Sequence, residues 1–323
     1  MINRRTFLSL SALALARPAW ASTKWPDRPI RLVVPFPAGG GVDSTGRIYS
    51  AAMSDLLGWQ VVVENRSGAS GAIGAQAVAK AAPDGYTFLL SSPAEVMVSE
   101  IAGQKLMYDP GQDLLPVALA GETPLGIVAH PSVPVENLQE LLALGKEKAA
   151  GISYGTPGNG STMHFAGEAL KGATGLQWQH VPYKGAAPAI NDLLGGQIEY
   201  AIAGLPPLVG HIKGGKLKAL AVTSSSRSDA LPDVMAVSEL PELKDFRFTN
   251  WMGVFAPRGT PAEIVDRFGG AFESVAKEPA VIERLKQAGL DPSGIRGEAF
   301  TRFLAEERQR YEAVARTTKL MLS

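Results

Sequence analysis

From Pro29 onward, short apolar runs rich in β-branched residues alternate with longer amphipathic segments. The short runs predict buried strands, and the longer segments, with Ala, Ile, Leu and Met at helical spacing, predict helices. This alternation is typical of parallel sheets covered by helices, so the expected fold class is α/β.

The predicted elements fall into two sets, which predict two Rossmann-like lobes. Strands are expected in the first set at residues 30–34, 61–63 and 87–90, with helices at 43–57 and 71–81. The second set has expected strands at 126–129, 152–154, 180–183, 198–202 and 217–222, with helices at 137–148, 163–171 and 188–194.

The C-terminal part of the chain has one predicted strand at 252–256, after a loop at 244–250, and is helical from Pro261. A lone strand with helices does not fold by itself, so this part is expected to complete the first lobe. The expected domains are residues 22–122 plus 247–323 for one lobe and 123–246 for the other. The chain then crosses between the lobes twice, near 118–124 and 245–251, and these crossings form a hinge.

The first residues have the pattern of a secretory signal. Arg4 and Arg5 precede an apolar stretch at 8–16, and the small-x-small triplet 19–21 follows Pro18. The stretch is shorter than the roughly 20 residues that span a bilayer. We therefore predict a signal peptide at residues 1–21 and a periplasmic protein, exported by the Sec or the twin-arginine route.

Composition excludes several classes of function. The sequence has 31 basic and 31 acidic residues, without the basic excess expected of a nucleic-acid-binding protein. It contains no cysteine, which excludes disulfides, thiolate catalysis and cysteine-based metal sites. No segment after the predicted signal has enough unbroken apolar residues to cross a membrane. Nucleic acid and integral membrane roles are therefore not expected.

A glycine-rich loop at 35–41 follows the first predicted strand and precedes a helix that begins near Val42. Glycines at such a place let backbone N–H groups approach an anion at the helix N-terminus. The loop lacks the G-x-G-x-x-G dinucleotide motif, because Ser44 stands where the third glycine would be. The alternative is a plain turn in which Asp43 caps the helix.

A second loop of this kind, residues 154–162, lies between a predicted strand and the helix that carries His164 and Glu168. Its N–H groups, two hydroxyls and one amide can surround a carboxylate without a formal positive charge, because the helix dipole contributes about half a charge. The alternative is that Ser161 or Thr162 only caps the helix.

Catalytic and metal motifs are incomplete. The segment 68–72 lacks the last glycine of a nucleophile elbow, and Leu217 replaces the hydroxyl residue that a Walker loop needs after Lys216. The histidines lack close metal-binding spacing, and each is expected to pack or to lie at the surface: His130, His164, His180 and His211. No enzyme, cofactor or metal is predicted.

Several segments resemble the Bug family, the periplasmic substrate-binding receptors of tripartite tricarboxylate transporters. They span essentially the whole mature chain in the expected order: 29–43, 61–66, 68–74, 79–87, 158–161, 181–185 and 192–197. The resemblance implies a type II periplasmic-binding-protein architecture, in which two lobes trap a carboxylate at their interface.

The resemblance also implies ligand-binding residues. They are Phe36, Ala38, Gly39, Gly40 and Asp43 in the first loop, Ser91 and Ser92 after a strand, Thr156, Asn159, Gly160, Ser161 and Thr162 in the second loop, and Gly204. For Ser91 and Ser92 the alternative is capping of the strand end. Gly204 offers no carboxylate to a ligand amine, so a carboxylate without an α-amino group is expected, unless Glu95 points into the cleft.

The implied partners are a small carboxylate and the membrane permease subunits of the transporter, with the receptor as a monomer. Two alternatives remain open from sequence. A sensor subunit for a membrane signalling protein needs the same ligand-dependent closure, and a secreted enzyme that binds phosphate in its glycine loops needs a nucleophile and a base.

Overall fold

The computed structural model describes residues 25–147 and 152–318. The predicted signal peptide and its cleavage position lie outside the described residues. The strands are β1 (Ile30–Val34), β2 (Val61–Asn65), β3 (Thr87–Ser91), β4 (Leu114–Ala129), β5 (Ile152–Thr156), β6 (Trp178–Pro182), β7 (Tyr200–Gly204), β8 (Lys218–Val222), β9 (Thr249–Pro257) and β10 (Asp291–Pro292).

Helices lie between these strands, as the alternating pattern predicts. They are α2 (Gly41–Leu57), α3 (Ala72–Ala79), α4 (Ser99–Ile101), α5 (Pro110–Asp113), α6 (Leu138–Glu147), α7 (Thr162–Thr174), α8 (Ala186–Leu194), α9 (Pro206–Lys213), α10 (Ala262–Ala276), α11 (Pro279–Gln287) and α12 (Gly297–Thr318). Short helical turns occur at η1 (Ala69–Gly71), η2 (Ala94–Val98), η3 (Val237–Glu239) and η4 (Pro241–Leu243), and η2 is π-helical.

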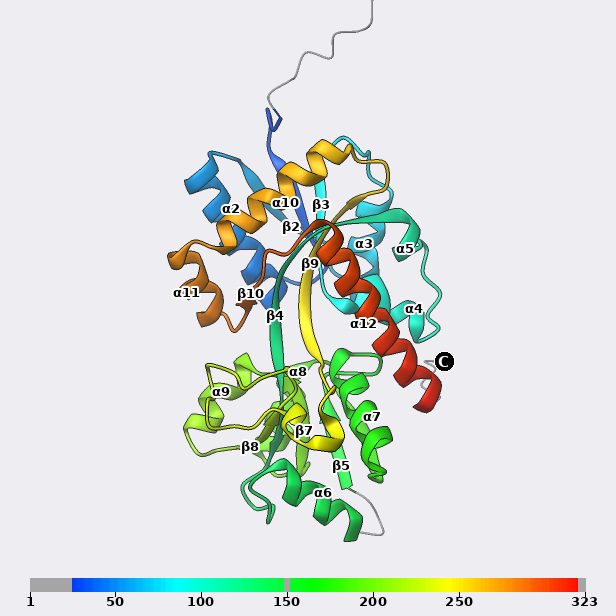
Figure 1. Ribbon diagram of the computed structural model, residues 1–323, viewed down its shortest axis with the longest axis vertical. Coiled ribbons are helices and arrows are strands. Elements are labelled where there is room, and N and C mark those ends of the chain that lie inside the picture. The colour runs from blue at the N-terminus through cyan, green and yellow to red at the C-terminus, as the bar shows by residue number, and fades with distance from the viewer. Residues whose placement is uncertain (1–24, 148–151, 319–323) are drawn as a thin grey trace, which may run out of the picture.

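The sheet has the strand order β2-β1-β3-β9-β4-β7-β5-β6, and β4 is its long central strand. The first part of β4 pairs with β9, from Leu114 to Pro124, whereas its last part, from Leu125 to Ala129, pairs with β7 and β8. The strand therefore belongs to both lobes, which lie one above the other in Figure 1. We call the half with β1, β2, β3 and β9 lobe one, and the half with β5 to β8 lobe two.

The directions of the strands decide which ends face the other lobe. In lobe one, β1 and β3 are parallel to each other, and both β3 and β4 are antiparallel to β9, so β1 and β3 run in the direction of β4, toward lobe two. In lobe two, β7 is antiparallel to β4 and β5 is parallel to β7, so both run toward lobe one. The carboxyl ends of β1, β3, β5 and β7 therefore point at the opposite lobe, where ligands of open α/β sheets bind.

The apolar core is continuous between the lobes on one face of the sheet. One buried cluster includes Val33 and Leu89 in lobe one, Trp251 and Tyr311 near the crossing, and Phe165 in lobe two. A second cluster fills the other face of lobe one, where Phe88 stacks on Phe268 with a centroid distance of 3.9 Å. Helix α12 extends from lobe one to lobe two, and its Tyr311 ring meets the Phe165 ring of α7 edge-on at 5.1 Å.

The main differences from the sequence prediction concern strand lengths and ends. The strand predicted at 126–129 is the last part of a strand that begins at Leu114. The strand predicted at 198–202 begins at Tyr200, and helix α9 was not predicted. Pro116 and Pro124 and the register shifts against β9 obscure the alternation that would have indicated one long strand.

Candidate functional site

The loop after β1 is held in shape by Asp43, which is buried in the first turn of α2. Its Oδ2 accepts hydrogen bonds from Gly39 N (2.8 Å) and Arg47 Nε (3.0 Å), and its Oδ1 accepts one from Asn65 Nδ2 (2.9 Å). Asn65 Nδ2 also donates to Phe36 O at 3.1 Å. Burial acts to raise the pKa of Asp43, but these hydrogen bonds outweigh it and hold the pKa at about 2. Asp43 is therefore ionised near pH 7, and its hydrogen bonds stabilise the conformation of the loop.

The alternative interpretation of this loop, in which Asp43 caps α2, is wrong. The N-cap is Gly40, and no side chain caps the helix. The N–H groups of Gly40 and Gly41 have no hydrogen-bond partner among the described residues. An uncapped helix N-terminus beside a glycine loop can receive an anion.

The loop after β5 has its own internal hydrogen bonds. Ser161 is the N-cap of α7: its Oγ accepts from His164 N (3.2 Å) and donates to Gly158 O (2.8 Å). Gly160 N donates to His164 Nδ1 at 3.1 Å, and Thr156 Oγ1 lies 2.6 Å from His180 Nε2. These contacts use the Ser161 hydroxyl proton and the Gly160 N–H within the protein.

Two stacked imidazole rings contact this loop through Gly160 and Thr156. His164 and His180 have ring centroids 3.7 Å apart. Burial lowers the pKa of each to about 4, so both are neutral near pH 7. The sequence predicted that His164 and His180 pack or lie at the surface. It did not predict their contacts with the loop, because the two histidines are on different elements, α7 and β6.

The N–H groups left in the second loop belong to Asn159, Thr162 and Met163, which have no hydrogen-bond partner among the described residues. Gly204, at the end of β7, lies beside the Met163 side chain, since a Cβ built on it would be 3.8 Å from Met163 Cε. The Thr162 hydroxyl accepts from Tyr311 OH at 3.2 Å. The structure thus gathers the predicted lobe-two residues at one edge of the sheet.

Ser91 ends β3 and Ser92 follows it; both are buried and both are bonded to Glu95. Glu95 Oε1 accepts from Ser91 Oγ and from Ser92 N, both at 2.9 Å, and Oε2 accepts from Ser92 Oγ at 2.8 Å. Glu95 is fully buried and does not extend into open space. Sequence reasoning identified all three residues but not the bonds among them.

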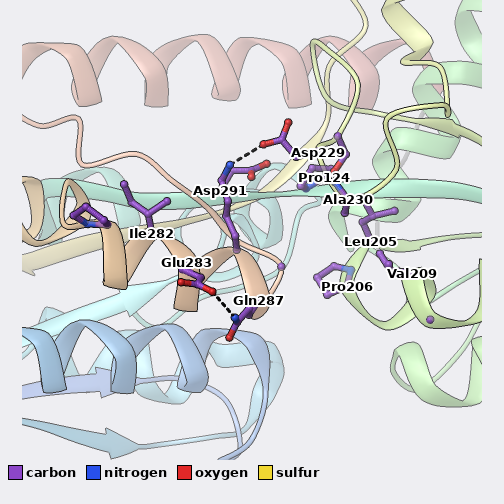
Figure 2. Close-up of a pocket in the computed structure, with 15 residues that line it drawn as sticks. Pro124, Leu205, Pro206, Val209, Asp229, Ala230, Ile282, Glu283, Gln287 and Asp291 are labelled. Atoms are coloured by element: carbon purple, nitrogen blue, oxygen red, sulfur yellow. Dashed lines mark hydrogen bonds and ion pairs between the residues drawn. The ribbon is translucent and has the colours of Figure 1, made fainter. Parts of the chain in front are cut away.

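A cavity of about 860 Å³ lies between the lobes, between α9 and the loop at 228–230 on one side and α11 on the other (Figure 2). Its walls include Leu205 and Pro206, which directly follow Gly204. Lys286 Nζ and Asp229 Oδ2 are paired across it at 2.7 Å. The predicted ligand-binding residues do not line this cavity.

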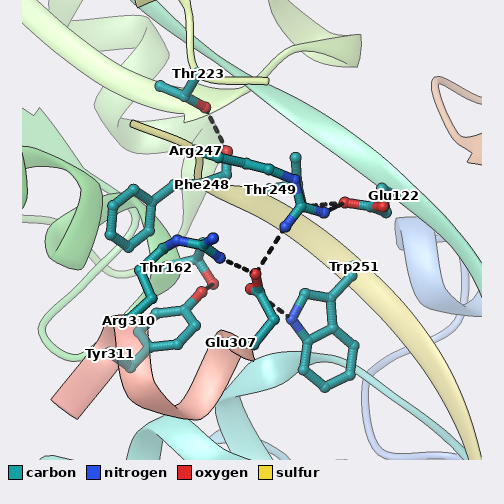
Figure 3. A network of polar contacts seen from close by, with 10 residues as sticks. All are labelled: Glu122, Thr162, Thr223, Arg247, Phe248, Thr249, Trp251, Glu307, Arg310 and Tyr311. Carbon is teal, nitrogen blue, oxygen red and sulfur yellow. Dashed lines mark hydrogen bonds and ion pairs between the residues drawn. The ribbon is translucent and has the colours of Figure 1, made fainter. Parts of the chain in front are cut away.

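A partly buried polar network, centred on the buried Glu307, lies where the chain crosses between the lobes (Figure 3). Arg247, just before β9, pairs with Glu122 of β4 and, at 2.8 Å, with Glu307 of α12. Glu307 also accepts from Arg310 and from Trp251 Nε1, the latter at 3.1 Å. The network ties both crossing strands to α12, and sequence reasoning missed it because its members are far apart in the chain.

Comparison with known proteins agrees with this architecture. The profile of the family described as "Tripartite tricarboxylate transporter family receptor" matches residues 46–320. The chain belongs to that family. Protein BugT of Bordetella pertussis is 36% identical over 310 residues, which cover 96% of this chain and 94% of BugT.

Solved structures of the family have the same fold. A Rhodopseudomonas palustris protein with adipate has a TM-score of 0.80 and 33% identity, with 91% of this chain and 98% of that chain covered. The periplasmic binding protein BugD has a TM-score of 0.76 and 34% identity, covering 92% and 99%. MatC from Rhodopseudomonas palustris, with bound malate, has a TM-score of 0.75 and 31% identity, covering 90% and 99%.

These comparisons confirm the predicted Bug family membership, the α/β two-lobe fold class and the receptor rather than enzyme assignment. The family consists of periplasmic solute-binding proteins. None of the helices within residues 25–147 and 152–318 is long and apolar enough to cross a membrane.

Proposed function

We propose that this receptor captures a small carboxylate between its two lobes and delivers it to the membrane permease subunits of a tripartite tricarboxylate-type transporter. The observation that supports this most strongly is the placement of two loops with unpaired N–H groups, one on each lobe, at carboxyl ends of strands that face each other. Such N–H groups bind an anion without a formal positive charge. The relatives solved with adipate and with malate make a carboxylate the first ligand class to test.

The proposed ligand-binding residues are those predicted from the sequence, and their hydrogen bonds indicate the role of each. Gly40, Asn159 and Thr162 contribute mainly through their unpaired N–H groups. The Gly39 N–H is already bonded to Asp43, so Gly39, Asp43, Thr156 and Ser161 fix the shape of the loops. The proposed division into lobes, 22–122 plus 247–323 and 123–246, places the hinge at the two crossings. We also propose a periplasmic, monomeric protein whose signal peptide, residues 1–21, is removed.

Ser161→Ala is expected to lower carboxylate affinity by more than it lowers stability. Loss of the cap alone costs about 1 kcal/mol of folding free energy. A loop that loses its bond to Gly158 also presents its N–H groups poorly, which should weaken binding by about 1.5–3 kcal/mol, as for a hydrogen bond to a charged group. Calorimetric titration measures the affinity, and denaturant unfolding measures the stability.

A matched control is Asp109→Ala, which removes the cap of α5 in lobe one, where Asp109 Oδ1 accepts from Gly111 N and Gln112 N. It should lower stability by a similar amount and leave affinity unchanged. If Ser161→Ala behaves like this control, Ser161 is only a helix cap.

A further inference from the structure

Three donors at the end of β3 converge on one buried carboxylate. The Ser91 hydroxyl, the Ser92 N–H and the Ser92 hydroxyl all lie within 2.8–2.9 Å of a Glu95 oxygen. The Ser91 hydroxyl has one other acceptor, Ser92 O at 3.3 Å, which also lies inside the protein. A serine hydroxyl has a single proton, so once it is donated inward, only lone pairs remain on the other side of the oxygen.

The surroundings of Glu95 hold its carboxylate in this position. Gly71, with φ +91°, packs against it so closely that a Cβ there would be 3.1 Å from Glu95 Cδ. Tyr108, the titratable side chain packed against the same turn, donates its hydroxyl to Glu95 O. No cation pairs with Glu95 among the described residues. Burial raises the pKa of Glu95 to about 7, although the bonds from Ser92 and Ser91 act to lower it.

The cluster lies at the edge of the sheet that faces the opposite lobe. Ser91 is the last residue of β3, which lies between β1 and β9 and ends toward lobe two. The loop that follows β1 is therefore its neighbour along the same sheet edge. Ser92 keeps 5% of its surface exposed, whereas Ser91 and Glu95 keep none.

We propose that Glu95 turns the end of β3 into a hydrogen-bond acceptor, so that the receptor takes a carboxylate whose other end is a donor, such as a hydroxyl or ammonium group, and discriminates against a second carboxylate. This inference rests on the proposed function. The donors that a second ligand carboxylate would need are already bonded to the protein's own carboxylate. A second anion here would also face the charge of Glu95 without a counterion.

Calorimetric titration with three ligand series tests the preference. Each series keeps one carboxylate and varies the far end: butyrate, 4-hydroxybutyrate, 4-aminobutyrate and succinate; the corresponding six-carbon acids ending in adipate; and benzoate with its 4-hydroxy, 4-amino and 4-carboxy derivatives. We expect the donor-ended member to bind at least about tenfold more tightly than the dicarboxylate in the series that fits, which is about 1.4 kcal/mol.

Glu95→Gln should reverse this preference at nearly constant volume. The amide oxygen still accepts from Ser91 and Ser92 N, while the amide nitrogen donates to Ser92 Oγ and leaves the serine proton free to point outward. The variant should therefore gain about tenfold or more in affinity for the dicarboxylate. Ser92→Ala should lose the preference for the donor without this gain, because the charge of Glu95 remains.

Glu100→Gln is the matched control, since it removes the same charge five residues away. Glu100 is on α4 and pairs with Arg308 at the surface, at 2.8 Å. It should leave the ranking of ligands unchanged.

A pH profile separates charge from packing. In the wild type, dicarboxylate affinity should rise as the pH falls from about 8 to about 6.5, because Glu95 takes up a proton, whereas the affinity of Glu95→Gln should change much less over that range. The two histidines of the other lobe are neutral throughout this range.

If carboxylates bind but the wild type prefers the dicarboxylate, or Glu95→Gln leaves the ranking and the pH profile unchanged, this inference is wrong while the proposed function stands. If no member of any series binds at millimolar concentration, the small-carboxylate proposal fails together with it.

Discussion

Arg247→Ala should destabilise the protein by about 3 kcal/mol, the largest effect that we expect from a single substitution. The side chain pairs with Glu122 on one crossing strand and with Glu307 on α12. Glu307 is 1% exposed, so removal of Arg247 leaves a buried carboxylate with fewer partners, and breaking a buried ion pair in this way costs about 3–5 kcal/mol. Arg310 and Trp251 remain bonded to Glu307, which places the expected loss at the lower end.

The loss should depend on pH with a defined sign. Burial already raises the pKa of Glu307, and loss of Arg247 raises it further. The folded state then binds a proton more tightly than the unfolded state, so the deficit is smallest below the unfolded pKa, about 4.3, and grows as the pH rises. Denaturant unfolding at about pH 4.5 and about pH 8 measures both values.

Two further variants test the cause. Arg247→Ala combined with Glu307→Gln should be more stable than Arg247→Ala alone near pH 8, because no charge is left buried. Arg227→Ala removes an arginine that pairs bidentately with Glu239 at the surface, and it should cost no more than about 1 kcal/mol. Equal losses for Arg247→Ala and Arg227→Ala would contradict the claim that Arg247 stabilises the buried carboxylate of Glu307 at the crossings.

Gly167→Ala should destabilise lobe two by about 2 kcal/mol. Gly167 is on the face of α7 that packs on β5, and a Cβ there would lie 2.3–2.5 Å from the Tyr154 ring. Tyr154 is fully buried and donates its hydroxyl to Glu168 at 3.1 Å, so the ring has no free space to occupy. Overpacking of this kind costs about 1–3 kcal/mol.

Gly172→Ala in the same helix is the matched control. A Cβ at Gly172 meets no atom within 4 Å, and alanine is favoured over glycine in a helix by about 1 kcal/mol. This variant should therefore be as stable as the wild type or more stable. If both substitutions changed the melting temperature in the same direction, the close packing of α7 on Tyr154 would be the wrong explanation.

The sequence predicted the fold well because the alternation of apolar runs and amphipathic segments is a local signal. Helices α2, α7 and α8 lie within a few residues of their predicted positions. The continuous β4 was not recognised, since only its last residues, 126–129, read as a strand. The switch of its partner from β9 to β7 after Pro124 is a property of the whole sheet, which local patterns do not contain.

The candidate site was predictable only in part for a related reason. Glycine loops before helices can be found in sequence, so the positions of Gly39, Gly40, Asn159 and Thr162 could be anticipated. The direction of a hydroxyl proton depends on a partner brought in by folding, as for Thr156 with His180. The same applies to Glu95. The sequence indicated only that a charge could lie in the cleft, whereas the structure shows that the carboxylate accepts hydrogen bonds from Ser91 and Ser92.

Calorimetric titration of the wild type, Gly40→Pro and Gly40→Ala with the tightest-binding carboxylate of the three series tests whether the N-terminus of α2 holds the ligand. Gly40 has φ −78°, which proline also adopts, so proline removes the N–H at a position whose φ it fits. Alanine keeps the N–H, and its Cβ would have an ordinary 3.5 Å contact with Pro37 O. We expect one carboxylate ligand per wild-type chain, a loss of at least about tenfold in affinity for Gly40→Pro, and an affinity within about twofold of the wild type for Gly40→Ala. Equal affinity in the proline variant and the wild type would contradict the claim that the N-terminus of α2 holds the ligand.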